Sequence, residues 1–399
     1  MEKTWVSIPD VLFFQEGPGV RNTQYTTEGV KLLNVANLVD GKIDLSTSDR
    51  YISEEEAYGK YKHFLCDVGD FIIASSGIKV EYIDKKMGFV DETMLPLCMN
   101  TSTIRFKVLD EKRLRIRYFM YYLKSQHFKD QLFKQITGSA QLNYGPSHLK
   151  KMIMPLISLD KQDEIVTCLD KVQGIIDMRQ QELIHLDDLI KARFVEMFGD
   201  PSTNPRGWDE TTISDECFYI KDGPHKSLTD IGKENGGHPF ISVRNIVNGR
   251  IDFSTARYIS DEDYADAIKK CHPEKGDMLY SKGGTTGIAK LIDIDEEFAN
   301  WVHVAVLKFD KSRLNGVFFE NMLNGSYCYE QSQRLTKGIA NRDLVLSAMA
   351  QIKLYCPPME LQNQFADFVH QVDKSKVAVQ KALDETQMLF DSLMQKYFM

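Results

Sequence analysis

Apolar residues recur alternately every four and three positions in two long stretches of the chain. A period of 3.5 residues, held over more than four heptads, keeps one apolar stripe on one face of a helix. An ordinary amphipathic helix drifts off this period and rarely runs past about 25 residues. The pattern therefore predicts two long helices that pack on each other in an antiparallel coiled coil. The predicted contact residues are Ile165, Leu169, Val172, Ile176, Leu183, Leu186 and Ile190, with Phe365, Val369, Val372, Val379, Leu383, Phe390 and Leu393.

Outside these stretches the hydrophobic pattern changes to short runs separated by glycine. Segments such as "HPFISVRNIV", "GDMLYS" and "VHVAVLKF" are rich in Val, Ile, Phe and Tyr, which is typical of strands. One longer segment, "RYFMYYLKSQHFKDQLFKQI", has the apolar spacing of a helix. These regions are therefore expected to form α+β domains.

The chain is a tandem repeat. "LVDGKIDLSTSDRYIS" at 38–53 corresponds to "IVNGRIDFSTARYIS" at 246–260, and the match continues in both directions at an offset that settles at 200. The first copy is seven residues longer between Asp70 and Asn100 than the second is between Asp277 and Asn300. We predict two α/β domains related by a pseudo-two-fold axis, at 1–157 and 201–358, each followed by a long helix, at 158–200 and 359–399.

Composition narrows the class of protein. The 399 residues carry a net charge of -8, which argues mildly against nucleic acid unless a local patch or a partner subunit supplies positive charge. Seven scattered cysteines without a C-x-x-C pair indicate neither disulfides nor a zinc site. The sequence shows neither a signal peptide nor an apolar stretch long enough to span a membrane, so we expect a cytoplasmic protein.

Catalytic motifs are not found. Pro9-Asp10 followed by Asp40-Gly41-Lys42 imitates a metal-dependent nuclease, but the second copy has Asn248-Gly249-Arg250, which lacks the carboxylate. Asp-Gly and Asn-Gly both suit a tight hairpin turn, and a turn is the interpretation that we adopt. "GGTTGIAK" lacks phosphate-loop spacing, and we find no motif for S-adenosylmethionine. His303 has no second ligand nearby. We expect no enzyme activity, no metal and no cofactor.

Three polar, basic loops recur in both copies and are candidates for DNA binding. Arg, Asn and Gln can make bidentate contacts to guanine and adenine edges, and nearby glycines can let the backbone approach phosphates. Any one such loop could be a solvated connection, but three repeated loops carry more weight. In the first copy the candidates are Arg21, Asn22, Gln24, Ser75, Ser76, Lys79, Ser139, Gln141 and Asn143. In the second they are Lys221, His225, Lys226, Arg244, Lys282, Thr285, Thr286, Lys290, Lys337, Asn341 and Arg342.

The whole chain resembles the specificity (S) subunits of Type I restriction-modification systems. The resemblance is carried by "EGPG" and "DGPH", by "PFISVRNIVNGRIDF" and "KGDMLYSKGGTTGIAKL", and by "IKLYCPPMELQNQF" with its counterpart "MIMPLISLDKQDEI". The first copy has Ile157-Ser158 where the family usually has Pro-Pro, which affects only the entry into the helix.

The resemblance implies two target recognition domains, each reading one half of a split site in double-stranded DNA. It also implies that the two helices dock two modification (M) subunits, which bind S-adenosylmethionine and methylate adenine. Restriction (R) subunits can join such a complex, and the specificity subunit itself carries out no chemistry.

Two other classes stay open from the residues alone. A stand-alone nuclease or methyltransferase would need a metal or cofactor motif, which we do not find. A purely structural coiled-coil scaffold would not need basic loops repeated in both globular copies.

Overall fold

The computed structural model describes residues 3–135, 142–247, 249–339 and 341–399, apart from the side chains of Ile78, Leu142 and Asn143. The chain forms two compact units. Unit 1 comprises residues 1–179 and 382–399, and unit 2 comprises residues 180–381. Each unit holds one copy of the repeated α+β region together with parts of both long helices.

Unit 1 is built on a four-stranded antiparallel sheet in the order β2-β11-β7-β9, formed by Leu12–Glu16, Thr103–Val108, Phe71–Ala74 and Met87–Phe89. A smaller sheet in the order β10-β3-β6 has one parallel pair and uses Leu97–Met99, Val30–Leu33 and Tyr51–Ile52. Three strand pairs complete the unit: β1 with β13 (Thr4–Ser7, Ile153–Leu156), β4 with β5 (Leu38–Val39, Lys42–Ile43) and β8 with β12 (Ser76–Ile78, Leu142–Asn143).

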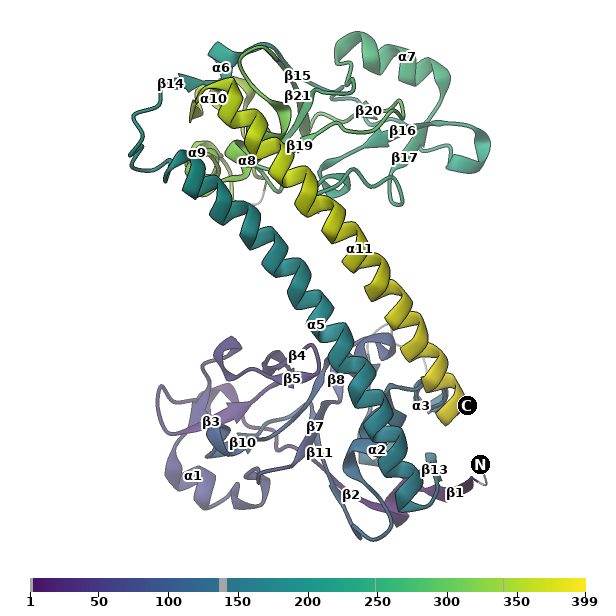
Figure 1. Ribbon diagram of the computed structural model, residues 1–399. Helices are drawn as coiled ribbons and strands as arrows, with labels where there is room; N and C mark the ends of the chain where they lie inside the picture. The colour runs from purple at the N-terminus through teal and green to yellow at the C-terminus, as the bar shows by residue number, and fades with distance from the viewer. Residues whose placement is uncertain (1–2, 136–141, 248, 340) are drawn as a thin grey trace. The chain divides into compact units, whose positions relative to one another are not determined.

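The helices of unit 1 lie on two sides of the four-stranded sheet. The smaller sheet and α1 lie on the side away from α5, whereas α2 packs against α5 (Figure 1). The short helices are α1 (Glu54–Tyr58), α2 (Ile116–Lys124), α3 (Gln126–Gln135) and α4 (Pro146–Leu149).

Unit 2 repeats this architecture, which confirms the predicted tandem α+β fold. Its four-stranded sheet has the order β15-β21-β18-β19, formed by Cys217–Asp222, Val304–Phe309, Met278–Ser281 and Ala289–Leu291. Its smaller sheet has the order β17-β16-β20, formed by Arg257–Ile259, His238–Ile241 and Ala299–Asn300. Strands β14 and β22 (Glu210–Thr212, Lys353–Tyr355) also pair.

The helices of unit 2 take corresponding places. Helix α7 lies beside the smaller sheet, and α8, α9 and α10 lie near the beginning of α11 (Figure 1). Their bounds, with that of α6, are Ile213–Glu216 (α6), Asp261–Lys270 (α7), Gly316–Asn324 (α8), Ser326–Leu335 (α9) and Leu346–Met349 (α10).

One expected helix is broken. The segment predicted as a single helix is divided at Ser125, whose backbone is extended, with φ -69° and ψ 152°. The Ser125 hydroxyl donates to the carbonyl of Tyr122 at 2.6 Å and accepts from the N–H of Phe128 at 3.3 Å. Serine thus ends α2 and caps α3, because its side chain competes for backbone hydrogen bonds.

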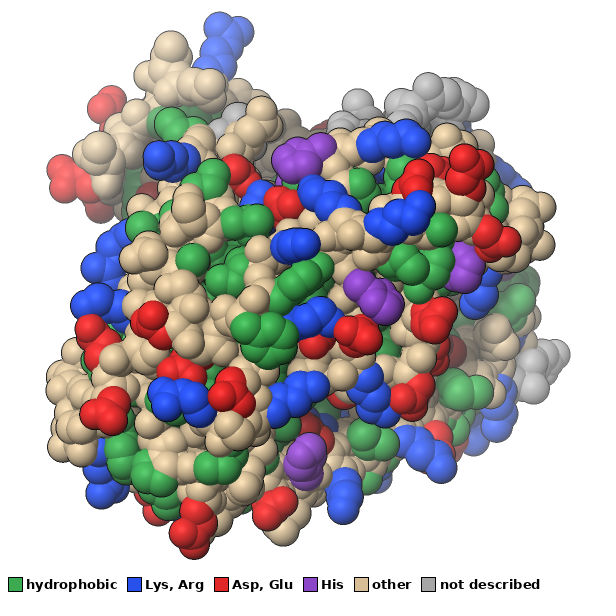
Figure 2. Space-filling model, turned by 90° about the horizontal axis from the view of Figure 1, so that it is seen from above, with side chains coloured by type: hydrophobic (Ala, Val, Ile, Leu, Met, Phe, Trp, Pro, Cys, Tyr) green, Lys and Arg blue, Asp and Glu red, His purple; other side chains and the backbone are tan. Residues whose placement is uncertain are grey.

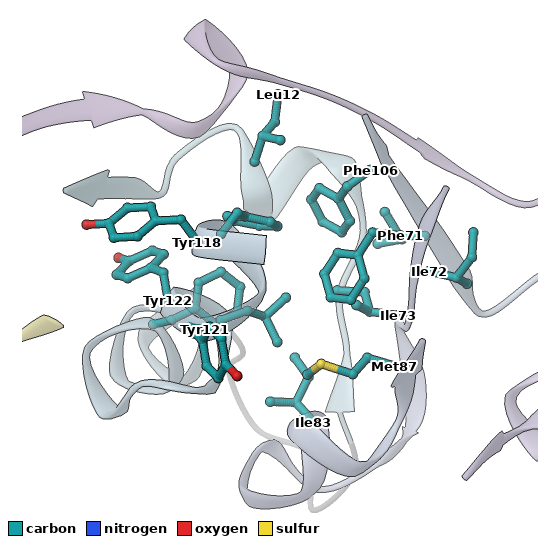
Figure 3. Packing of buried hydrophobic residues seen from close by; sticks show 14 of the residues in the cluster. Leu12, Phe71, Ile72, Ile73, Ile83, Met87, Phe106, Tyr118, Tyr121 and Tyr122 are labelled. Carbon is teal, nitrogen blue, oxygen red and sulfur yellow. The ribbon is translucent and has the colours of Figure 1, made fainter. Parts of the chain in front are cut away.

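Aromatic side chains fill the core of unit 1. Phe71 and Phe106 of the sheet face the helix that carries Tyr118, Tyr121 and Tyr122 (Figure 3). Phe106 and Phe119 lie 5.0 Å apart between ring centroids, and both are fully buried. This packing of sheet against helix fixes β2 and β7, the strands that lead into the first two polar loops of unit 1.

The two long helices are α5 (Leu159–Phe198) and α11 (Met359–Phe398), and they run antiparallel in each unit. In unit 1, Arg179 of α5 donates to the carbonyl of Ala382 and the hydroxyl of Thr386 in α11. In unit 2, Lys376 pairs with Asp187 at 2.5 Å. Arg179, Lys376 and Thr386 interrupt the apolar period, and each therefore has a polar partner on the facing helix.

The predicted contact residues of the two helices are buried or half-buried in the structure. Ile165, Leu169, Val172, Ile176, Ile190, Phe365, Val369, Val372 and Phe390 are buried. The remaining predicted contact residues, Leu183, Leu186, Val379, Leu383 and Leu393, are half-buried.

A second stripe at the end of each helix packs on a recognition domain. Phe198 of α5 lies 4.9 Å from Phe318 of α8, and Phe398 of α11 lies 5.2 Å from Tyr118 of α2, between ring centroids. These phenylalanines do not follow the 3.5-residue period, so the sequence pattern did not reveal them. The α+β domain of each copy is therefore packed against the end of the helix that starts from the other copy.

Candidate nucleic-acid interface

One buried asparagine in each copy holds the repeated segment in shape. Asn37 accepts from the N–H of Asn34 at 2.9 Å and donates to the carbonyl of Asp44 at 3.1 Å and the hydroxyl of Thr47 at 3.2 Å. Asn245 makes the same three bonds in the second copy, at 2.8, 2.9 and 3.2 Å. The repeated sequence thus encodes the same hydrogen-bonded turn in both copies.

The Asp-Gly pair within this segment is a turn, as the sequence interpretation held. Asp40 has φ 46° and Gly41 has φ 79°, the left-handed region that this residue pair tolerates. Strands β4 and β5 flank the pair. In the second copy Gly249 has φ 72°, whereas Asn248 lies outside the described residues. Among the described residues no group of three or more His, Cys, Asp or Glu could hold a metal ion.

The three predicted loops of unit 2 meet at Lys282. Its ammonium lies 3.5 Å from the Asp222 carboxylate of the first loop and 3.1 Å from that of Asp343 in the third. The N–H of Gly284 donates to the carbonyl of Arg342 at 3.0 Å, which ties the second loop to the third. Loops that are far apart in the sequence therefore form one surface.

The loops of unit 1 meet at the corresponding place. The hydroxyl of Ser75 donates to the Glu16 carboxylate at 3.4 Å, and the N–H of Tyr144 donates to the Ser75 carbonyl at 3.0 Å. Strand β12 pairs with β8, which joins the third loop to the second. Ser139 and Gln141 lie outside the described residues, and of Asn143 only the backbone is described.

Gly17 of "EGP" and Gly223 of "DGP" have a packing role. A Cβ atom on Gly17 would lie 2.0 Å from the carbonyl oxygen of Asn100. One on Gly223 would lie 1.7 Å from that of Asn300. Only glycine allows this backbone contact between the first loop and the strand region before β11 or β21.

The structure divides the predicted site residues into exposed and internally engaged groups. Exposed are Arg21, Asn22, Lys79, Lys221, His225, Lys226, Arg244, Thr285, Lys337, Asn341 and Arg342. Of these, Lys226 lies 3.4 Å from Asp263, and His225 lies 3.9 Å from Asp222. Ser75, Lys282, Thr286 and Lys290 are buried, and Ser76 and Gln24 are half-buried.

The engaged side chains serve the fold of the loops. Gln24 donates to Glu56 at 2.5 Å and to Tyr61 at 3.1 Å. Lys290 pairs with Glu320 at 3.4 Å; burial raises the pKa of that carboxyl, and the lysine charge opposes the rise. These groups hold the surface together rather than projecting from it.

Sequence reasoning missed a basic hollow in unit 1. A cavity of about 480 Å³ is lined by Lys79, Lys85 and Lys86 together with Tyr82 and Asp40. Most of these residues belong to the short helix Val80–Lys85 and its flanks, within the region where the first copy is longer. The seven extra residues of the first copy were the feature of the sequence that could have pointed to this hollow. On the face drawn in Figure 2, Lys and Arg are interspersed with Asp and Glu.

Two segments of the chain, 25–187 and 205–386, match the family described as "Type I restriction modification DNA specificity domain". The chain belongs to the Type I restriction-modification specificity subunit family. It is 22% identical over 326 residues to the Type I restriction enzyme MjaIX specificity subunit of Methanocaldococcus jannaschii, covering 78% of this chain and 74% of that protein. It is also 22% identical over 380 residues to the putative MjaX specificity subunit of the same organism, covering 89% and 84%.

Solved structures share the fold of this specificity subunit. The crystal structure of a Type I restriction-modification S subunit from M. genitalium superposes with a TM-score of 0.54 at 17% identity, covering all of this chain and 96% of that one. A chain from a study of Type I complex assembly and conformational transition gives 0.53 at 16% identity, with 99% and 97% coverage. This specificity subunit has two DNA-recognition domains, one in each copy of the repeat.

No helix among the described residues of the specificity subunit is both long and apolar enough to cross a membrane.

Proposed function

We propose that residues 1–157 and 201–358 are target recognition domains that each bind one half of a bipartite site in double-stranded DNA. The convergence of three polar loops on Ser75 in one copy and on Lys282 in the other carries this proposal. Two copies of one scaffold with different loop residues suit two different half-sites. The chain needs no cofactor or metal of its own and performs no catalysis.

Phosphate contacts in the first half-site come from the basic hollow of unit 1. Lys79 and Lys85 are exposed, Lys86 is half-buried, and the Lys85 ammonium lies 5.8 Å from the Tyr82 ring. Lysines of this kind position DNA without reading its sequence. Arg21 on its exposed turn is the candidate for base contact in this copy.

The helices α5 and α11 dock two M subunits, and R subunits can join the complex. Both helices expose large apolar side chains: Met178 is 65% exposed, Val377 70% and Met388 72%. Exposed apolar residues along a helix favour packing against helices of a partner protein. The M subunits supply the methyl transfer.

The test is sequencing of methylated adenines in cells that express this chain with its M subunit. We expect one bipartite, asymmetric motif, and a continuous or palindromic motif would contradict the proposal. Arg21→Ala should relax one half-site only, because a base contact is worth about 1–3 kcal/mol of discrimination. Lys226→Ala should affect the other half-site only. Equal effects of Arg21→Ala on both halves would show that the domains are wrongly assigned.

A double variant tests whether the lysines of the basic hollow contact DNA phosphates or base edges. Lys85→Gln with Lys86→Gln should weaken binding of all sequences alike and lower the salt dependence, because phosphate contacts release counterions. The control is Lys112→Gln on the turn before α2, which removes one positive charge at an exposed position outside the hollow. Filter binding across a salt series measures both.

A further inference from the structure

Unit 2 contains a small hollow beside the repeated turn. It has a volume of about 210 Å³ and is lined by Phe240, Ser242, Arg244, Arg257 and Trp301. Phe240 belongs to β16 and Arg257 to β17, and Trp301 directly follows β20, so the smaller sheet forms its base. Among the described residues, two guanidinium groups and two aromatic rings line this hollow, and backbone hydrogen bonds together with the charges of Arg257 and Arg244 lower the pKa of the neighbouring Asp230 carboxyl.

The arginines are held in place. The guanidinium of Arg244 donates to the carbonyl of Thr255 at 2.6 Å, and that of Arg257 lies 5.8 Å from the Trp301 ring centroid. The Nε1 of Trp301 is buried and has no hydrogen-bond partner among the described residues. Planar, donor-rich groups thus surround the hollow.

Unit 1 has different residues at the corresponding place. The N–H of Asn100 donates to the carbonyl of Leu33 at 3.1 Å, as the N–H of Trp301 donates to that of Ile241 at 2.9 Å. In this backbone register Asn100 takes the place of Trp301, although the sequence repeat aligns it with Asn300, and its side-chain amide donates to the Asn34 side chain at 2.8 Å. Residues that differ between the copies, on a scaffold that they share, create the hollow.

We propose that this hollow accepts an unstacked nucleobase of the DNA bound by unit 2. Side chains that read paired bases protrude into a groove, whereas a hollow admits only a group that projects from the DNA. Bases turned out of the stack are bound by aromatic rings and guanidinium planes. Because Arg and Trp only donate hydrogen bonds, the base should present acceptors, as guanine does with O6 and N7.

A phosphate also projects from DNA, and the first experiment separates it from a base. The full chain with Trp5→Phe and Trp208→Phe keeps Trp301 as its single tryptophan. It is titrated with the pentanucleotide TTGTT and with the same strand carrying an abasic site in place of guanine, which keeps every phosphate. We expect quenching of Trp301 fluorescence by TTGTT, and an affinity about tenfold or more weaker for the abasic strand, because stacking binds the base.

Equal quenching by both strands would assign the hollow to phosphate, and absence of Trp301 quenching would show that no base enters; either result overturns the proposal. If circular dichroism shows that the double variant does not fold, the difference between the wild type and Trp301→Phe supplies the same signal. This experiment uses the chain alone and needs no methylation motif.

The second experiment rests on the proposed function and uses the assembled complex with the methylated duplex. Single mismatches are placed at each position of the half-site of unit 2. A mismatch lowers the energy needed to unpair a base, so we expect tighter binding at one position other than the methylated adenine. Trp301→Ala should abolish this gain, Trp301→Phe should retain part of it, and Arg50→Gln in unit 1 should leave it unchanged.

Mismatches that weaken binding at every position, with or without Trp301, would contradict the base-binding role in the complex. Failure of the proposed function would give a different result: cells with the wild-type chain would show no bipartite methylated motif. The pentanucleotide experiment uses the chain alone, so its result would not be affected.

Discussion

Lys282 illustrates how a residue with the chemistry of a DNA contact can serve the fold instead. Its side chain is only 7% exposed and lies between the carboxylates of Asp222 and Asp343. We expect Lys282→Ala to destabilise unit 2 by about 2–4 kcal/mol, because two carboxylates lose their buried partner. Lys226→Ala, an exposed lysine, should change stability by less than about 0.5 kcal/mol. Urea unfolding monitored by circular dichroism measures both, and equal effects would contradict this role.

Glu216 gives unit 2 a dependence on acid pH. Its buried carboxylate accepts from Arg313 at 2.8 and 2.9 Å, and this hydrogen bonding holds its pKa below the ordinary value of 4.5. The resulting stabilisation is present above the unfolded-state pKa of about 4.5 and is lost as pH falls through the lower folded-state pKa.

Glu216→Gln should therefore flatten the acid limb of the stability curve of unit 2, measured by urea unfolding between pH 7 and 3. Asp163→Asn removes a solvent-exposed pair with Arg115 in unit 1 and should change the curve little. If both variants flatten the curve equally, burial of Glu216 is not the cause.

At the scale of elements, one glutamine joins each long helix to its own domain. Gln362 accepts from the N–H of Asn315 at 2.8 Å and donates to the carbonyls of Arg313 at 2.9 Å and Pro357 at 2.7 Å. Gln162 makes the equivalent bonds to Arg115, Arg113 and Ile157, and both glutamines are fully buried.

We expect Gln362→Ala to destabilise this joint by about 2–4 kcal/mol, because it leaves one buried N–H and two carbonyls without their partner. Hydrogen exchange of the first turns of α11 measures the local opening. Gln371→Ala, on an exposed face of the same helix, is the control and should leave exchange unchanged. Protection that survived Gln362→Ala would contradict the joint.

The sequence predicted these elements unevenly, for physical reasons. The 3.5-residue period is a direct consequence of helix packing, so α5 and α11 could be placed closely. Phe198 and Phe398 could not be found this way, because they lie off the 3.5-residue period and pack on Phe318 and Tyr118, although Phe198 also contacts Phe365 of α11. The break at Ser125 depends on side-chain hydrogen bonds that a hydrophobic pattern does not contain.

The candidate site shows the same limit. Repetition identified the loops, but the partners of Lys282 and Lys290 lie far away in the sequence, so their burial could not be predicted. Trp301 and Arg257 were not among the candidates, because they lie far apart in the sequence and only the fold places both beside one hollow.

At the scale of the whole molecule, the shared scaffold predicts that the recognition domains are interchangeable. Replacing residues 205–357 by residues 1–155 should give a folded protein that methylates an inverted repeat of the first half-site. The contact between each domain and the end of the other copy's helix supports this exchange, because Tyr118 packs on Phe398 as Phe318 packs on Phe198. Methylome sequencing, after circular dichroism confirms folding, measures the outcome. A direct repeat or the parental motif would contradict the pseudo-two-fold arrangement.

The packing of Phe398 on Tyr118 also sets the order in which the protein can mature during synthesis. Unit 1 needs residues 382–399, which follow its other residues only after all of unit 2 has been translated. At about 5–20 residues per second, the core around Tyr118 waits roughly 10–40 s for its last side chains. Until then Tyr118 lacks the cover of Phe398, so we expect the ribosome-bound chain to expose an apolar surface there.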